Sequence, residues 1–289
     1  MPKPSALACP ASFKGVLSAR AAAAALADGF ERAGVECVQL PLADGGEGTD
    51  DALGAHRDGA TVVEAAEAIP FDPARLDVMA SSRPFGELLA ALEAERLLVG
   101  LGGTANMDAG AGLLEVLDAL PARTIVLCDV QTTLFDAPRL FGPQKGATPE
   151  QVAELERRFR SAEALAPFAA LAGSGAAGGL GAALASLGAE LVPGAATILD
   201  LLGFDPRGYD LVVTGEGRVD ATTAEGKAPA EVVRRCREAG VPCVVCAGLV
   251  VEPLPGVETI PLSGDPARAA EDLAELGLRL GARLLDAAR

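Results

Sequence analysis

The run Val35-Glu-Cys-Val-Gln-Leu-Pro-Leu-Ala-Asp-Gly-Gly-Glu-Gly-Thr49 combines the features that decide the fold. Its apolar first part predicts a strand over residues 35–42, a loop with three glycines and two carboxylates follows, and residues 48–56 predict a helix. A strand that passes through a glycine-rich loop into a helix is typical of open α/β sheets. Such sheets bind ligands at the carboxyl ends of their strands.

The same alternation of short apolar runs and Ala/Leu-rich segments extends along the chain and predicts parallel strands connected by helices. The predicted strands are residues 6–9, 35–42, 97–101, 124–130, 210–214 and 243–247. The predicted helices are residues 18–33, 48–56, 86–94, 109–120, 149–171, 178–187, 229–239 and 266–288.

Both chain ends have a plain strand–helix pattern, whereas residues 60–83 show no regular pattern and residues 203–209 are rich in turn formers. We therefore expect two α/β domains. Residues 1–60 and 204–289 would form a flavodoxin- or Rossmann-like, doubly wound parallel sheet, and residues 61–203 an inserted second α/β lobe. A cleft between the two lobes is the expected ligand site.

The composition restricts the class of partner. The 289 residues carry 24 Lys and Arg against 40 Asp and Glu, a net charge of −16, which repels nucleic acid and anionic membranes. No basic segment precedes an apolar stretch, and no uncharged run approaches the ~20 residues that span a bilayer, so we expect neither a signal peptide nor a membrane helix. The six cysteines lie mostly in apolar runs, as expected for buried thiols in a reducing cytoplasm.

Two familiar catalytic arrangements are disfavoured. Cys243 and Cys246 form a CxxC motif, but residues three apart on a strand point to opposite faces, so one metal ion cannot take both. His56 is the only histidine, which argues against Ser-His-Asp and Cys-His catalysis.

Lysine use is selective. The chain has only four lysines, and Lys14, Lys145 and Lys227 each lie beside a glycine. A neighbouring glycine lets backbone amides approach an oxyanion while the ammonium group supplies the charge. We interpret these three lysines as candidate anion ligands; solvated loop lysines are the alternative.

Two carboxylates share the loop after the second predicted strand. Asp44 and Glu47 are costly together unless a cation or a hydroxyl donor lies between them. They are therefore candidates for holding Mg²⁺ or orienting a substrate hydroxyl. The alternative is a tight turn in which Glu47 caps the following helix.

A second glycine loop, Gly100-Leu-Gly-Gly-Thr-Ala-Asn-Met-Asp108, follows another predicted strand. Its glycines and the expected helix start favour an anion site. With Asp129 at the next strand end, the loop also fits a weak G-x-G-x-x-A dinucleotide fingerprint. Asp108 counts against that reading, because a carboxylate would lie where a pyrophosphate should bind.

Three further segments follow the pattern of glycine beside lysine or acid, or of glycine before a helix. Residues 141–146 and 214–229 combine glycines with Lys145, Glu216 or Lys227, and residues 173–181 form a glycine-rich helix start that fits close packing and ligand contact equally. Cations, amides and carboxylates at strand ends are the groups that phosphoryl transfer needs. Neither a Walker A motif nor a protein-kinase motif is present.

These segments together resemble the bacterial type I glycerate kinases, from about Cys9 to Gly248. The motifs that carry the resemblance are Ser12-Phe-Lys-Gly15, Pro41-Leu-Ala-Asp-Gly-Gly-Glu-Gly-Thr49, Gly100-Leu-Gly-Gly-Thr104, Phe141-Gly-Pro-Gln-Lys-Gly-Ala147, Gly175-Ala-Ala-Gly-Gly-Leu-Gly181, Thr214-Gly-Glu-Gly-Arg218 with Asp220, and Gly226-Lys-Ala-Pro229. The resemblance implies phosphorylation of D-glycerate by ATP with Mg²⁺. It also implies two α/β domains, one split across the termini, with the active site between them. The expected product is 2-phosphoglycerate, with 3-phosphoglycerate as the other possibility.

On this reading each candidate residue has an expected role. Asp44 is the expected general base, and Lys14 and Glu47 complete the catalytic set. The residues expected to bind substrate or phosphate are Ser12, Gly45, Gly46, Gly102, Gly103, Thr104, Lys145, Glu216 and Lys227. The residues expected to bind Mg²⁺ are Asp44, Asp108, Asp129 and Asp220. A small-molecule substrate, a cytoplasmic location and no nucleic-acid or membrane partner are expected, with a homodimer as a possible assembly.

The chain also departs from the family pattern. Ala11 stands where a family member usually has Asp, and the amide in the second glycine loop is displaced to Asn106. The usual Asn-Pro-Leu after residues 128–130 is missing, and the middle of the chain is shorter than in a typical member. Two alternatives therefore stay open: an NAD(P)-dependent oxidoreductase of a small hydroxy acid, and a degenerate family member that binds ligand without turnover.

Overall fold

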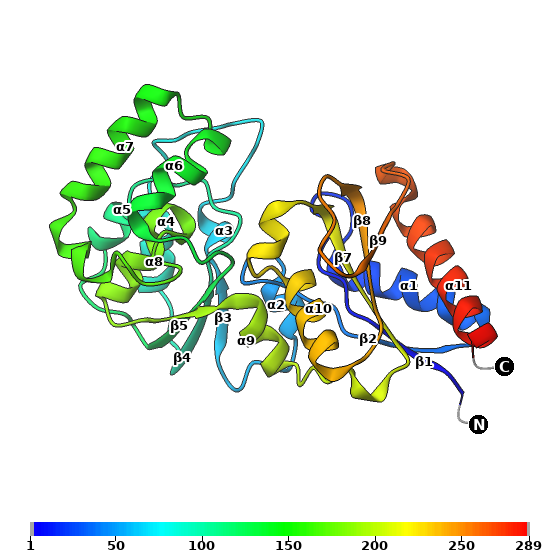
Figure 1. Cartoon of the computed structure of the whole chain (residues 1–289). Coiled ribbons are helices and arrows are strands. Elements are labelled where there is room, and N and C mark those ends of the chain that lie inside the picture. Colours follow the sequence, from blue (N-terminus) through cyan, green and yellow to red (C-terminus); the bar gives the residue numbers. More distant parts are fainter. Residues whose placement is uncertain (1–2, 288–289) are drawn as a thin grey trace. The chain divides into compact units, whose positions relative to one another are not determined.

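The computed structural model describes residues 3–287, which divide into two compact units (Figure 1). Unit 1 comprises the described residues of Met1–Ala43, Asp51–Leu53 and Ile198–Arg289. Unit 2 comprises Asp44–Asp50 and Gly54–Thr197. The expected fold class, two α/β domains with parallel sheets, is confirmed. The expected domain limits, residues 1–60 with 204–289 for one domain and residues 61–203 for the other, stay a prediction.

Unit 1 is built on a five-stranded parallel sheet of order β2-β1-β7-β8-β9. The strands are β1 (Ser5–Ala8), β2 (Glu36–Gln39), β7 (Leu211–Val219), β8 (Cys243–Val250) and β9 (Glu258–Pro261). The chain leaves β1 toward one edge and returns at β7 to build the other edge. The strand order therefore reverses between β1 and β7, and this is the place where open α/β sheets bind ligands.

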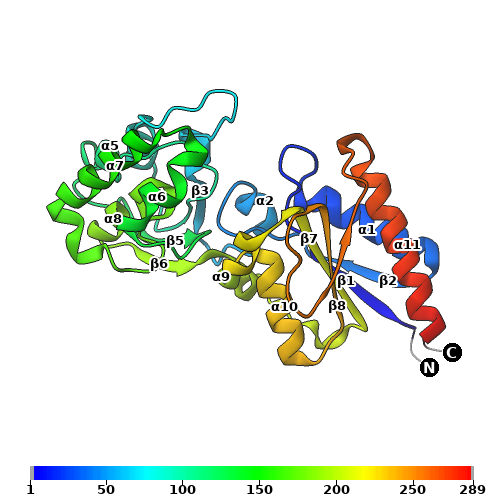
Figure 2. The ribbon, with the colours of Figure 1, turned by 45° about the horizontal axis from the view of Figure 1, so that its top comes forward.

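Helices cover both faces of this sheet (Figure 2). Helices α1 (Ala19–Ala33) and α11 (Ala269–Ala287) pack together on one face, and α10 (Ala228–Ala239) packs on the other. The alternation along β8 explains both contacts, since Val244 and Cys246 join the core under α1 and α11 while Val245 joins the core under α10.

Unit 2 is built on a four-stranded parallel sheet whose order, β3-β4-β5-β6, follows the chain. The strands are β3 (Thr61–Glu64), β4 (Arg96–Gly100), β5 (Arg123–Cys128) and β6 (Glu190–Pro193). Its helices are α3 (Ala65–Ala68), α4 (Arg83–Ala90), α5 (Ala111–Leu114), α6 (Ala137–Phe141), α7 (Pro149–Ser161) and α8 (Ala176–Ser186). Helices α2 (Thr49–Leu53) and α9 (Gly194–Leu201) each have residues of both units.

Short 3₁₀ turns complete the secondary structure. They are η1 (Leu134–Asp136), η2 (Pro143–Lys145), η3 (Glu163–Phe168), η4 (Pro206–Gly208), η5 (Ala221–Glu225) and η6 (Pro266–Arg268). Within residues 3–287, no helix combines the length and the apolar character needed to cross a bilayer.

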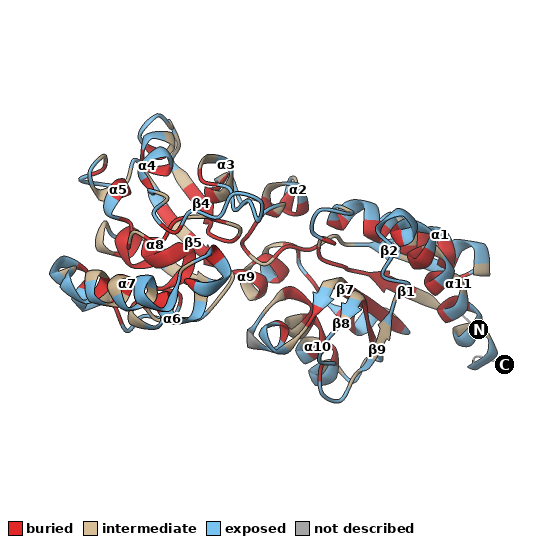
Figure 3. Ribbon diagram, turned by 90° about the horizontal axis from the view of Figure 1, so that it is seen from above, coloured by how far each residue is buried: buried red, intermediate tan, exposed pale blue. Residues whose placement is uncertain are grey.

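Helix α8 forms the centre of unit 2, and Figure 3 shows it buried over most of its length. A Cβ atom on Gly178 would collide with the Asn106 carbonyl, and one on Gly181 would collide with the Gly173 carbonyl. The glycines of residues 173–181 therefore allow close backbone packing. Of the two interpretations of this segment, packing is the one that the contacts support.

Three strands were not predicted from the sequence. β6 and β9 have half-polar sequences, and β3 lies in residues 60–83, where no regular structure was expected. That expectation was wrong for residues 61–68, since the prolines that suggested it lie downstream of α3. The predicted helix at 109–120 is also shorter than expected and spans only Ala111–Leu114.

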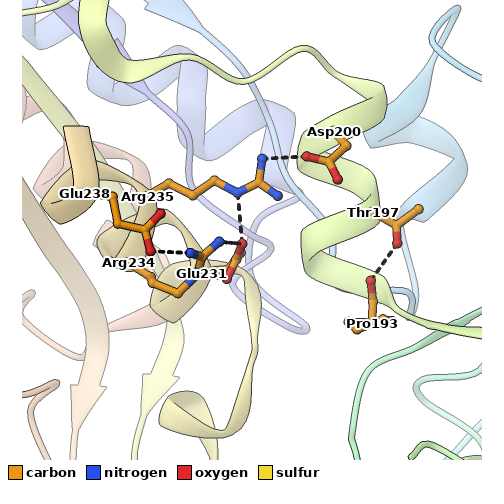
Figure 4. A network of polar contacts seen from close by, with 7 residues as sticks. All are labelled: Pro193, Thr197, Asp200, Glu231, Arg234, Arg235 and Glu238. Carbon is orange, nitrogen blue, oxygen red and sulfur yellow. Dashed lines mark hydrogen bonds and ion pairs between the residues drawn. The ribbon is translucent and has the colours of Figure 1, made fainter.

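An ion-pair network fixes the end of α9 to α10 within unit 1 (Figure 4). Arg235 Nη1 lies 2.7 Å from Asp200 Oδ1, and Arg235 Nε lies 2.8 Å from Glu231 Oε1. Glu231 also binds Arg234, with 2.6 Å between Oε1 and Nη2. Because the side chains of Arg235 and Glu231 are only 17% and 12% exposed, water screens this pair less than a surface ion pair.

Candidate active site

The loop of residues 44–50 lies against the carboxyl ends of all four strands of the sheet in unit 2. At the end of β4, the Gly102 amide donates to the Gly45 carbonyl at 3.0 Å. At β5, a Cβ atom on Gly45 would lie 2.5 Å from the Leu127 carbonyl oxygen. After β6, a Cβ atom on Gly194 would collide with the Asp44 carbonyl. The loop thus occupies the edge where open α/β sheets bind their ligands.

Glu64, at the end of β3, completes this arrangement and was missed by the sequence reasoning. Its Oε2 accepts a hydrogen bond from the Gly48 amide and its Oε1 one from the Asp50 amide, both at 2.9 Å. The side chain is buried, and it satisfies amides at the start of α2 that would otherwise lack a partner. Glu64 therefore does the capping that one interpretation assigned to Glu47, which is exposed. The β-branched run Thr61-Val-Val before it indicates the strand, but no residue type marks Glu64 as the capping side chain.

The two glycine loops meet backbone to backbone. A Cβ atom on Gly102 would lie 2.7 Å from Gly46 Cα and 3.0 Å from Asp129 Oδ2. A Cβ atom on Gly46 would lie 3.4 Å from Asp44 Oδ1. We call the contact between Gly46 and Gly102 the glycine crossing. The carboxylates of Asp44 and Asp129 both border it, and a side chain at either glycine would displace the loops.

Lys145 brings a cation to the same end of unit 2. Its Nζ donates a hydrogen bond of 2.8 Å to the Asn106 carbonyl, and its side chain is buried. Burial lowers the pKa of the Lys145 ammonium to about 8, against the opposing attraction of the carboxylates of Asp129 and Asp108. An ammonium group that interacts with the carboxylates of Asp129 and Asp108 is a candidate contact for phosphate oxygens.

Asp108 has a structural role in this arrangement. Its carboxylate accepts hydrogen bonds from the amide and hydroxyl of Ser82 and from the amides of Gly110 and Gly112. The Asn106 side chain also donates to it, at 3.2 Å. These donors occupy both oxygens, so the assignment of Asp108 as a Mg²⁺ ligand stays a prediction that requires some of them to be exchanged.

The second glycine loop does not run directly into a helix. Gly103 and Thr104 pair with residues 70 and 71, and the next helix begins only at Ala111. The expected helix start after this loop was wrong, whereas the anion-binding role of Gly102, Gly103 and Thr104 stays a prediction. The dinucleotide interpretation of this loop also loses support, because that motif places a helix N-terminus beside the pyrophosphate.

Four predicted site residues of unit 1 line one pocket of about 460 Å³. They are Ser12, Lys14, Glu216 and Lys227. Asp220, also in unit 1, caps η5 and lies 2.9 Å from Arg218 Nε. A hydrogen bond from the Thr222 hydroxyl, helped by Arg218 and Lys227, lowers the pKa of the Asp220 carboxyl.

Of the four predicted Mg²⁺ ligands, Asp44, Asp108 and Asp129 belong to unit 2 and Asp220 belongs to unit 1. Among residues 3–287, no group of three or more His, Cys, Asp or Glu side chains is arranged to hold a metal ion. Mg²⁺ does not need such a cage, since in phosphoryl-transfer sites one or two carboxylates and the substrate phosphates bind it. Asp44 and Asp129 beside the glycine crossing match that donor set.

Comparison with known proteins identifies the family to which this α/β chain belongs. The model of the glycerate kinase family matches residues 6–72, 55–122 and 119–262, and the chain belongs to this family. It is 33% identical to a glycerate kinase of Bacillus subtilis (strain 168), covering 83% of this chain and 84% of the relative. It is 32% identical to a glycerate 2-kinase of Escherichia coli (strain K12), covering 84% of each.

A solved structure agrees with this assignment. The crystal structure of a candidate glycerate kinase 2 from Salmonella typhimurium LT2 superposes with a TM-score of 0.78 at 29% identity. The match covers 99% of this chain and 100% of the other. The family resemblance noted in the sequence is therefore confirmed.

Proposed function

We propose that the protein transfers the γ-phosphoryl group of ATP to D-glycerate, with Mg²⁺, and that the product is 2-phosphoglycerate. Membership of the glycerate kinase family and the E. coli relative's name support this reaction. The observation that carries it is the gathering of Asp44, Asp129 and Lys145 at the strand ends of unit 2. Phosphoryl transfer depends on positioned charge, and these are the charges it requires.

Each charged group has a place in the proposal. Asp44 accepts the proton of the glycerate hydroxyl, because a carboxylate suffices as the base for a loose transition state. Lys145 in unit 2 and Lys14 and Lys227 in unit 1 contact phosphate or carboxylate oxygens.

Asp44 and Asp129 are the residues that would hold Mg²⁺ with the phosphates, and the bound ion would neutralise charge on the transferred group. Because Gly46 and Gly102 carry no side chains, backbone amides of the two loops could also donate hydrogen bonds to the phosphates. Glu47 is exposed in the structure and stays a predicted member of the catalytic set.

The test is product analysis with the purified protein. We expect incubation with ATP, Mg²⁺ and D-glycerate to give ADP and a phosphorus NMR signal coupled to the proton on carbon 2. Chelation of Mg²⁺ should stop the reaction. A signal coupled to the protons on carbon 3 would correct the product to 3-phosphoglycerate.

The same assay separates the alternatives. Nucleotide binding without ADP release on D-glycerate, tartronate semialdehyde or hydroxypyruvate would identify a degenerate family member. Thermal stabilisation by NAD(H) but not by Mg-ATP would favour the oxidoreductase, and either result would refute the proposed function.

A further inference from the structure

The pocket of unit 1 lies where the strand order of its sheet reverses. Its walls come from the segments that follow β1, β9 and the carboxyl-terminal ends of β7 and β8, and its volume is about 460 Å³. That volume lies within the range of roughly 300–1,000 Å³ that is typical of small-molecule sites. The pocket belongs wholly to unit 1 and can therefore be analysed by itself.

Part of the pocket lining is apolar and open to solvent. Val16 and Leu249 line the pocket with exposed fractions of 40% and 50%, and Phe13 and Leu262 also belong to its lining. Large aliphatic side chains that stay exposed in a concave site gain free energy when an apolar ligand covers them. A ligand with an apolar face would therefore match these side chains.

The pocket lining also carries charge. Its charged residues are Lys14, Arg218, Lys227, Glu216, Asp265 and Asp272. Arg218 is engaged by Asp220 at 2.9 Å, and the Glu216 carboxylate accepts a hydrogen bond of 2.8 Å from the Thr223 hydroxyl. Lys14 is exposed and Lys227 is half-buried, so the two ammonium groups can meet an anion at the pocket.

The wall after β9 is held in place by a buried carboxylate. Asp272 Oδ2 accepts a hydrogen bond of 2.9 Å from the Ser263 amide and a second, short one from the Ser263 hydroxyl. These bonds fix the segment that carries Leu262 and Gly264 against the start of α11. The apolar wall is therefore preorganised, which lowers the entropic cost of binding a rigid ligand.

Size and chemistry distinguish the two substrates of the proposed reaction. D-glycerate is a three-carbon acid with polar groups on every carbon, and it would leave Val16, Leu249 and Leu262 in water. A purine ring has flat apolar faces, and a nucleotide joins them to a chain of phosphates. Of the two substrates, only the nucleotide matches both the apolar and the charged residues of this lining.

We propose that this pocket binds the adenosine end of the nucleotide, with the base against Val16, Leu249 and Leu262 and the phosphates toward Lys14 and Lys227. The inference rests on the proposed function for the identity of the nucleotide. It assigns nucleoside recognition to unit 1, while Asp44, Asp129 and Lys145 of unit 2 act at the transferred phosphoryl group.

The chain has no tryptophan, so a single introduced one reports on its surroundings without background. We expect Leu249→Trp fluorescence to change on addition of ADP or of adenosine, which lacks phosphates, and to stay constant with D-glycerate. Val38→Trp is the control, because Val38 lies on β2 of the same unit, is 40% exposed and does not line the pocket.

A second variant tests affinity. Val16→Glu should weaken ADP binding, measured by calorimetry, by about tenfold or more, because the base would have to pack against a carboxylate. Val38→Glu, at a valine of the same exposed fraction, should leave it unchanged. The KM for D-glycerate should change less than the KM for ATP in Val16→Glu.

The outcomes separate this inference from the proposed function. If calorimetry shows ADP binding while the fluorescence of Leu249→Trp is constant and Val16→Glu binds normally, the pocket assignment is wrong even though the kinase activity stands. A fluorescence response of Leu249→Trp to D-glycerate alone would also overturn it. If the wild-type protein binds ADP in this pocket but releases none from ATP with D-glycerate, the proposed function fails and the pocket assignment stands.

Discussion

Gly46 and Gly102 meet backbone to backbone, and a Cβ atom on Gly102 would lie 2.7 Å from Gly46 Cα. This contact joins two loops that are more than fifty residues apart in the sequence, and the carboxylates of Asp44 and Asp129 border it. The site in unit 2 therefore depends on the absence of two side chains as much as on the presence of the charged ones.

The first prediction concerns this contact. Gly102→Ala should lower the free energy of unfolding by about 1–3 kcal/mol and reduce kcat, because the added methyl group forces the loops and Asp129 apart. Urea denaturation and steady-state kinetics measure the two effects. Gly208→Ala is the matched control, since a Cβ atom there has no neighbour within 4 Å. If Gly102→Ala and Gly208→Ala have the same free energy of unfolding and the same kcat, the glycine crossing is not tightly packed.

The second prediction concerns Glu64. Glu64→Gln turns one of its two acceptor oxygens into a donor that faces an amide, which should cost about 1–3 kcal/mol and loosen the loop of Asp44. We expect kcat to fall while the KM for ATP changes little. Glu67→Gln is the control, because Glu67 is exposed and close to the charges of Glu64 and Asp50, so removing its charge should not destabilise the protein. A fall in stability with an unaltered kcat would limit Glu64 to a structural role.

The third prediction is a pH dependence of stability. The pKa of Lys145 is lowered to about 8 in the folded protein, below its value in the unfolded chain. Between these two pKa values the unfolded state binds more protons, so the free energy of unfolding contributed by Lys145 rises with pH from about 8 to about 10.5. Below pH 8 the cost of burying the ammonium is fully present.

Lys145→Met lacks this titration and isolates its effect. From pH 7.5 to pH 10, the wild-type protein should gain stability relative to Lys145→Met, by up to about 3 kcal/mol, because Lys145 is only 6% exposed. Urea denaturation at the two pH values measures the difference. A difference that does not vary with pH would mean that the ammonium is not desolvated.

The fourth prediction concerns Lys14. Lys14→Ala should reduce kcat by about 10²-fold, the usual effect of losing one group that stabilises charge in a transition state. Because Lys14 is exposed, the Tm measured by thermal denaturation should stay at the wild-type value. Lys3→Ala removes another exposed lysine that does not line the pocket, and its kcat should stay at the wild-type value.

The sequence predicted the fold class well where pattern and burial agree. Strands such as β4, with buried Leu97, Leu98 and Val99, are apolar on both faces and were recognised. β6 and β9 carry exposed Glu190 and Glu258, and short half-polar strands lack a clear signal. Helix 109–120 was overextended because an Ala/Leu-rich composition does not show where tertiary contacts end a helix.

The candidate site was predicted in part. Lys14, Asp44 and Glu216 were predicted because a charged residue beside a glycine can be recognised from the sequence alone. Glu64 escaped notice because its partners are backbone amides of residues 48 and 50, which no residue type reveals. The apolar wall of the pocket in unit 1 escaped for a similar reason, since Val16, Leu249 and Leu262 are ordinary aliphatic residues until the sheet brings them together.

The most direct test of the proposed reaction is the rate of D-glycerate-dependent ADP release by the wild-type protein and by Asp44→Asn, under the same concentrations of ATP and Mg²⁺. We predict turnover by the wild-type protein and a fall in kcat of about 10²–10⁴-fold in Asp44→Asn, with unchanged thermal stability. If Asp44→Asn retains wild-type turnover, Asp44 is not the base. If neither protein releases ADP in the presence of D-glycerate, the proposed reaction is wrong.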